Sequence, residues 1–156
     1  DFIRIVDNIS YKQRIVTIEN YEDFIQSFLS DDKKYIENYL NQKLLSVSYY
    51  DNYESFYHGY SLGLFSILLT SNNFIVKSNR ETGLGRSDVL IEKVDRSVGV
   101  VVEFKLAENE TDMETQASEG VKQIKEREYY KELVLDEVKD IKEIVIVFNG
   151  KKAIVR

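Results

Sequence analysis

The sequence predicts a mixed α/β domain, and three observations support this fold class. Apolar residues recur at helical spacing in the segments before residue 70, and a segment after residue 112 begins with the acids typical of a helix N-terminus. Runs rich in Val, Ile and Phe, bounded by turn-forming residues, lie between these helical segments and after the second of them. One such run, residues 98–106, is apolar on both faces, as expected of a central strand. The predicted order is helix, three strands, helix and strand, preceded by an additional helical segment.

Length and composition limit the class of protein. The 156 residues are enough for one domain with one core, and 43% hydrophobic with 31% charged residues is typical of a chain that folds. Lys and Arg total 21 against 27 Asp and Glu, which gives a net charge of −6 and excludes a uniformly basic nucleic-acid binder. Five of these acids lie within residues 108–119. A polyanion would therefore have to bind at a local patch.

Cysteine and histidine content restricts the chemistry. With no Cys and one His, disulfides, thiolate zinc sites, Cys nucleophiles and multi-histidine metal centres are excluded. A metal ion would need oxygen ligands, which favours Mg²⁺, Mn²⁺ or Ca²⁺. The sequence shows neither an apolar run of membrane-spanning length nor a secretory leader, so we expect a cytoplasmic protein without membrane contact. Because the first residue is Asp1 rather than Met, we also expect a longer chain upstream.

Residues 20–47 are predicted to form two short helices. Their apolar residues follow helical spacing, and the Ser-Asp-Asp of residues 30–32 supplies both the break and the N-cap of the second helix. We expect residues 1–48 to be an N-terminal helical extension and residues 49–156 to be the main domain.

The first part of the main domain is predicted to contain one helix and three strands. Asp51–Asn52 caps a helix that runs to about residue 70 and carries its apolar residues on one face. Strand-like runs follow at residues 74–78, 88–94 and 98–106, separated by turn signals.

The rest of the domain is predicted to be a helix and a strand pair. A helix is expected over residues 112–133, because the acids in its first turn suit the positive end of the helix dipole. Residues 141–148 have the pattern of a buried strand, and Asn149–Gly150 turns the chain into a short partner strand that ends at Val155.

Two carboxylates are predicted to face each other across a hairpin. If the turn is centred between Asp95 and Arg96, the pairing places Asp88 directly opposite Glu103. Opposed residues have Cβ atoms about 4.5 to 5.5 Å apart, so two carboxylates would repel unless a positive group lay between them. A divalent cation satisfies that requirement.

Lys105 is predicted to lie on the same sheet face, because it is two residues beyond Glu103. Unpaired charges buried in a central strand cost several kcal/mol, which favours a functional role for them. One interpretation is a metal-dependent phosphodiesterase, in which the carboxylates hold Mg²⁺ and Lys105 orients the attacking water or stabilises the oxyanion. The alternative is a structural domain in which Asp88, Glu103 and Lys105 form an internal ion-pair network without metal.

Five sequence blocks resemble one known family. In this order over about residues 40–155, they are ESFYHGYSLGL (54–64), KSNRETGLGRSD (77–88), VVEFKLA (101–107), GVKQIKEREY (120–129) and VFNGKKAIV (147–155). They are similar to the PD-(D/E)XK nuclease superfamily, and in particular to a bacterial branch found C-terminal to AAA-ATPase-like domains. One departure is that Ser87, not Pro, precedes Asp88.

The resemblance implies a restriction-endonuclease-like αβββαβ core in residues 49–156, with residues 1–48 as the tail of, or linker from, an upstream AAA-ATPase-like region. It implies a nuclease that uses Mg²⁺ or Mn²⁺ and acts on nucleic acid, DNA rather than RNA. A second copy of the chain, in a homodimer, is a further partner that we consider.

The resemblance also assigns the site residue by residue. Glu54 is similar to the first-helix acid, Asp88 to the motif Asp, and Glu103 and Lys105 to the E-x-K pair. Glu54, Asp88 and Glu103 would then hold the metal ion, with Asp88, Glu103 and Lys105 as catalytic residues. Gln123 is similar to the polar residue on the following helix, where it would take a catalytic and substrate-binding role.

Other polar residues leave alternatives open. Arg86 lies on the Asp88 face by alternation and would either contact a backbone phosphate or neutralise the carboxylates. Gln123 without the family pattern would be an exposed helix residue. The basic stripe of Lys122, Lys125, Arg127 and Lys131 is explained by solvated pairing with nearby acids at helical spacing.

A second function of a different class is consistent with the sequence. In that hypothesis the domain is catalytically idle and serves the AAA-ATPase-like neighbour as a binding or oligomerisation module.

Overall fold

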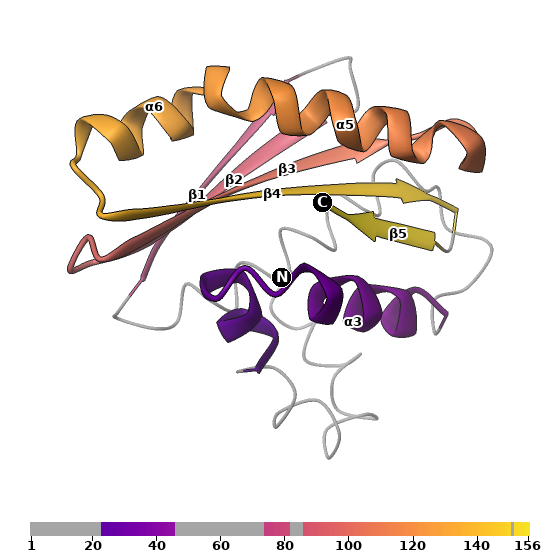
Figure 1. Cartoon of the computed structure of the whole chain (residues 1–156), viewed down its shortest axis with the longest axis horizontal. Coiled ribbons are helices and arrows are strands. Elements are labelled where there is room, and N and C mark those ends of the chain that lie inside the picture. The colour runs from indigo at the N-terminus through magenta and orange to yellow at the C-terminus, as the bar shows by residue number, and fades with distance from the viewer. Residues whose placement is uncertain (1–22, 46–73, 82–85, 151) are drawn as a thin grey trace, which may run out of the picture.

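The computed structural model describes residues 23–45, 74–81, 86–150 and 152–156, and these form a mixed α/β fold with helices on both faces of one sheet (Figure 1). The sheet has five strands in the order β1-β2-β3-β4-β5. Their bounds are β1 (Phe74–Glu81), β2 (Arg86–Lys93), β3 (Val98–Leu106), β4 (Asp140–Asn149) and β5 (Lys152–Val155). Neighbouring strands are antiparallel except β3 and β4, which are parallel. The predicted fold class is confirmed.

The predicted hairpin and its register are confirmed. The turn after β2 carries Arg96 at a φ of 59°, and the Arg96 N–H bonds the Lys93 carbonyl at 2.8 Å. The register places Asp88 opposite Glu103, as the sequence predicts. β1 continues past its predicted end at residue 78, and β2 begins before its predicted start at residue 88. The two strands are longer at these ends because they pair with each other from Phe74–Lys93 to Glu81–Arg86.

The crossover between the parallel strands β3 and β4 lies on one face of the sheet (Figure 1). It consists of α5 (Met113–Gln123) and α6 (Glu128–Leu135), with single 3-10 turns before and after α5. The prediction of one continuous helix over residues 112–133 is wrong. The helix is interrupted at Arg127, whose backbone is extended with φ −71° and ψ 148°, and neither Pro nor Gly lies there to cause the break.

The other face is covered by helical residues 23–29 and by α3 (Lys33–Leu45), as Figure 1 shows. The predicted break at residues 30–32 is confirmed, with Asp31 at a φ of 58°. The Asp32 Oδ1 accepts a hydrogen bond from the Tyr35 N–H at 3.1 Å and so caps α3. The helix predicted from Asp51 to about residue 70 lies outside the described residues.

Alternation along β3 divides the core in two. Val100, Val102 and Phe104 face α3 and pack with its apolar residues, among them Ile36. Val101 faces the crossover helices, and the apolar residues packed with it are Leu90, Met113, Ala117, Ile124, Leu133, Val145 and Val147. Glu103 and Lys105 follow Val101 at intervals of two, so they lie on the crossover side. No helix among the described residues is long and apolar enough to span a membrane.

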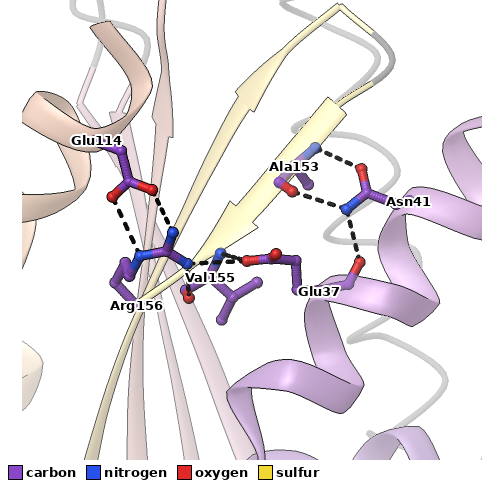
Figure 2. A network of polar contacts seen from close by, with 6 residues as sticks. All are labelled: Glu37, Asn41, Glu114, Ala153, Val155 and Arg156. Carbon is purple, nitrogen blue, oxygen red and sulfur yellow. Dashed lines mark hydrogen bonds and ion pairs between the residues drawn. The ribbon is translucent and has the colours of Figure 1, made fainter. Parts of the chain in front are cut away.

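Side chains of α3 bind the outer edge of β5, as Figure 2 shows. The Asn41 amide forms two bonds to Ala153: Nδ2 donates to its carbonyl at 2.8 Å, and Oδ1 accepts its N–H at 2.8 Å. The Glu37 Oε2 accepts the Val155 N–H at 2.8 Å. An edge strand exposes unpaired backbone groups that invite pairing with another chain. In this sheet α3 occupies those groups.

Arg156 connects this edge to the other face of the sheet (Figure 2). Its Nη1 lies 3.0 Å from the Glu37 Oε2 on α3, and its Nε donates to the Glu114 Oε2 on α5 at 3.2 Å. The last residue of the chain therefore links the helices of both layers.

Replacing Asn41 by Ala is expected to lower the free energy of unfolding by about 1 to 3 kcal/mol, because it leaves the Ala153 N–H and carbonyl without their partners. Urea denaturation checks this. The matched control is Asn38→Ala, since Asn38 is exposed on the same helix and Ala is the better helix former. Equal stability of the two variants would contradict the role of Asn41 at the edge.

Candidate active site

Two buried carboxylates lie opposite each other on the crossover side of the sheet. Asp88 on β2 pairs in register with Glu103 on β3. Their exposed fractions are 7% for Asp88 and 0% for Glu103. The hairpin positions both, because the turn sets the register and period-two alternation sets the face. Apolar residues Leu90 and Val101 continue the same face beside them.

Lys105 lies next to this pair. Its Nζ is 3.9 Å from the Glu103 Oε1, and its side chain is 10% exposed. Gly120 on α5 makes room at this point: a Cβ there would lie 2.7 Å from the Val145 Cγ1 and 3.3 Å from the Lys105 Cε. The glycine thus allows α5 to approach β4 and the stem of the lysine closely.

Arg127 completes the cluster and is the residue that sequence reasoning missed. Its Nη2 donates to the Glu103 Oε1 at 2.9 Å and its Nε donates to the Glu103 Oε2 at 3.3 Å. Both oxygens of the carboxylate are therefore bound by one guanidinium, in the two-pronged geometry that makes Arg–carboxylate pairs strong.

The expectation that the basic stripe is solvated is wrong for Arg127, whose side chain is 12% exposed. Lys125, which is exposed, pairs with Glu143 on β4 at 3.7 Å and not with an acid on its own helix. One signal for Arg127 was available in the sequence: it lies four residues after Gln123, on the same helical face as the predicted site residue.

Gln123 reaches the site through Arg127. It is the last residue of α5, and its Oε1 accepts a hydrogen bond from the Arg127 Nη2 at 3.2 Å. Arg86 begins β2 two residues before Asp88, but its side chain lies outside the described part of the structure. Glu54 lies outside it as well. Among the predicted site residues, the structure therefore brings Asp88, Glu103 and Lys105 together directly and Gln123 indirectly.

The donor set suits a cation that prefers oxygen ligands. Within the described ranges, no third His, Asp or Glu joins Asp88 and Glu103 to form a larger ligand group. Mg²⁺ is commonly held by one or two carboxylates, with water and substrate phosphate completing its octahedron. Asp88 and Glu103 fit this arrangement.

Glu92 is a third buried acid on the same strand face, two positions beyond Leu90, with 4% of its surface exposed. Burial and then the Asp136 carboxylate raise the pKa of Glu92; Glu132 also raises it, while Arg96 and Lys77 oppose the shift. An acid with a raised folded-state pKa binds protons more readily in the folded protein than in the unfolded chain. Its contribution to stability is therefore lost as the pH rises above 4.5, the ordinary value.

Replacing Glu92 by Gln is expected to raise the free energy of unfolding at neutral pH, because an ionised carboxylate no longer has to be buried. The gain should disappear at about pH 4, where Glu92 is protonated in both the folded and unfolded states. Urea denaturation of both proteins at the two pH values checks this. A gain that is the same at both would contradict the proposed cause.

A comparison with protein-family models establishes the family to which the chain belongs. The model of the PD-(D/E)XK nuclease superfamily matches residues 52–156, which is more than half of the chain. The chain belongs to the PD-(D/E)XK nuclease superfamily. Its mixed five-stranded sheet is consistent with the restriction-endonuclease-like core that the resemblance implied. No curated protein and no solved structure matches the chain.

The superfamily match contains every residue predicted for the site, and it begins after α3. Members of this superfamily generally use divalent metal ions, and the name points to a nucleic acid substrate. Asp88 and the sequence Glu103-Phe104-Lys105 match the D and E-X-K letters of the name, with Ser87 in place of the Pro.

Proposed function

We propose that this chain contains a nuclease domain that hydrolyses phosphodiester bonds with a divalent cation. The observation that carries the proposal is the register of β2 and β3, which pairs Asp88 with Glu103 beside Lys105 in a member of a nuclease superfamily. Two buried carboxylates and a lysine on one face provide both a cation ligand set and a positive group for phosphate chemistry.

Each residue takes a role that its chemistry allows. Asp88 and Glu103 hold the cation, and Glu54 from the preceding segment is proposed as a third ligand. The cation, when bound, supplies Lewis-acid polarisation of the phosphate and a water of lowered pKa. Lys105 orients the attacking water or donates to the oxyanion that develops on the phosphate, since its ammonium lies within 3.9 Å of the ligand carboxylate.

Arg86 and Gln123 are proposed to bind substrate. Arg86 precedes Asp88 by two residues on β2 and would contact a backbone phosphate. Gln123 holds Arg127 and so acts on the position of a group that binds Glu103. A catalytic role for Gln123 is part of the same proposal.

Finer features of the function are supported by the sequence blocks. We propose Mg²⁺, or Mn²⁺, as the cation and DNA as the preferred substrate. We also propose a bacterial, cytoplasmic protein whose upstream region is AAA-ATPase-like, with a homodimer as a further assembly. Residues 1–48 are proposed as the helical extension and residues 49–156 as the nuclease domain, with α3 docked on β5.

A second candidate function is favoured by the Arg127 contact. Because Arg127 already binds both oxygens of Glu103, the cluster is also suited to a structural ion-pair network in a catalytically idle binding module. In that case the domain would serve its upstream neighbour and would need no cation.

Cleavage assays distinguish the two candidates. Supercoiled DNA, linear DNA and RNA are incubated with the protein and Mg²⁺ or Mn²⁺, beside a chelator control and the Asp88→Ala and Lys105→Ala variants. The nuclease proposal predicts metal-dependent cleavage that both substitutions abolish. Cleavage that survives both would contradict the proposed site, and no cleavage by wild-type protein with either ion would favour the binding module.

A further inference from the structure

Arg127 lies between two helical segments, where it is the extended N-cap residue of α6. Its extended conformation interrupts the crossover helix between the 3-10 turn ending at Glu126 and the start of α6. The Arg127 N–H bonds the Ile124 carbonyl at 3.1 Å, and its carbonyl accepts the Lys131 N–H at 3.1 Å. The break thus keeps the local hydrogen bonds while it directs the guanidinium to Glu103.

The Glu103 carboxylate is occupied on both oxygens by this guanidinium. A divalent cation that binds Glu103 would have to share or displace these bonds, and it would repel the positive charge beside it. The cation and Arg127 therefore compete for the same buried carboxylate.

The charges of the four described side chains in the cluster balance. Asp88 and Glu103 contribute two negative charges, and Lys105 and Arg127 contribute two positive charges, so the sum is zero. A cation alone would leave this buried region with excess positive charge. If a phosphate bound together with the cation, its negative charge would offset part of that excess. A guanidinium displaced from Glu103 also needs another anion, and its fork fits phosphate as well as carboxylate.

We infer that Arg127 is a positioning residue that exchanges between two anions. It holds Glu103 when no cation is bound, and it turns to the substrate phosphate when a divalent cation takes the Glu103 carboxylate. Gln123 tethers the guanidinium during this exchange through its bond to Nη2. The inference rests on the proposed function, because it assumes that Asp88 and Glu103 hold the cation. Its consequence is that cation and phosphate each increase the affinity for the other.

Calorimetric titration of the full chain with Mn²⁺ at neutral pH tests the exchange, with and without thymidine 5′-monophosphate as a phosphate probe that contains no phosphodiester. In wild-type protein the nucleotide is expected to tighten Mn²⁺ binding. Arg127→Met should bind Mn²⁺ alone about tenfold more tightly, and the nucleotide should then add little, because the competing group and the phosphate ligand are both lost.

The control is Lys125→Met, which removes an exposed positive charge two residues away in the chain and should leave both affinities unchanged. Thermal unfolding provides a second readout. Without Mn²⁺, Arg127→Met should have a lower Tm than wild type, because Glu103 has lost its two hydrogen bonds from the guanidinium. Mn²⁺ should raise the Tm of the variant more than that of wild type. If Arg127→Met does not fold, Arg127→Lys replaces it. A gain in Mn²⁺ affinity is still expected because a lysine cannot bind both oxygens, and it should be smaller because the lysine keeps the positive charge.

The outcomes separate this inference from the proposed function. Wild-type Mn²⁺ binding that depends on Asp88 but is not tightened in the Arg127 variant would overturn the inference alone. The inference alone would also be overturned if the nucleotide strengthened Mn²⁺ binding equally in wild type and in the Arg127 variant. Absence of Asp88-dependent Mn²⁺ binding in both proteins would overturn the proposed function and the inference together.

Discussion

Lys105→Met is expected to lower the rate of DNA cleavage by about 10²- to 10³-fold, the effect of removing one group that stabilises an oxyanion. The substitution keeps the apolar stem that packs at Gly120, where the Lys105 Cε lies 3.3 Å from the position of a Cβ. Glu103 stays bound by the Arg127 fork. The free energy of unfolding should therefore fall by less than in a variant that removes Glu103 itself, because the carboxylate keeps both hydrogen bonds from the guanidinium.

Cleavage kinetics and urea denaturation on the same preparations check both halves of this prediction. Lys125→Met is the matched control, because that side chain is 64% exposed and pairs with Glu143 rather than with the site. A Lys105→Met protein that cleaves at the wild-type rate would exclude Lys105 from the chemistry. A protein that loses activity only because it unfolds would show that the ammonium has a structural role.

Glu103→Ala is expected to lower the free energy of unfolding by about 3 to 5 kcal/mol, the range for breaking a buried ion pair on one side. Glu103 is fully buried, and its loss leaves the guanidinium of Arg127 and the ammonium of Lys105 without their shared carboxylate. Denaturant unfolding measures the effect. The same variant should also lose cation binding, since one of the three proposed ligands is gone.

Two comparisons isolate the electrostatic cause in Glu103→Ala. Glu110→Ala removes an acid that is 66% exposed and pairs with Lys152 at the surface, so it should change the stability far less than Glu103→Ala does. The double variant Glu103→Leu with Arg127→Leu removes both charges and should recover much of the stability, because an apolar pair of similar volume often replaces a buried ion pair without loss. A double variant as unstable as Glu103→Ala would contradict this cause.

The hairpin of the site could be predicted from the sequence because its register follows from local features. A short turn at Asp95 and Arg96 and the period of two along each strand fix which residues oppose each other. The pairing of Asp88 with Glu103 and the common face of Glu103 and Lys105 need no information from distant parts of the chain. The N-cap by Asp32 was predictable for the same reason.

The break in the crossover helix could not be predicted in this way. Residues 112–133 contain no Pro and only one Gly, at position 120, so local propensity favours a continuous helix. The interruption lies at Arg127, where the side chain binds Glu103 from a position 24 residues away in sequence. The contact of Asn41 with Ala153, separated by 112 residues, is likewise absent from any local pattern.

The sequence by itself therefore determined the α/β class, the hairpin and the facing carboxylates, because periodicity and turn chemistry act over a few residues. Only the tertiary structure decided what neutralises Glu103, where the crossover helix ends, and how α3 covers the edge of β5. These features depend on packing between distant segments, where a buried charge or an open strand edge must find a partner that spacing along the chain does not specify.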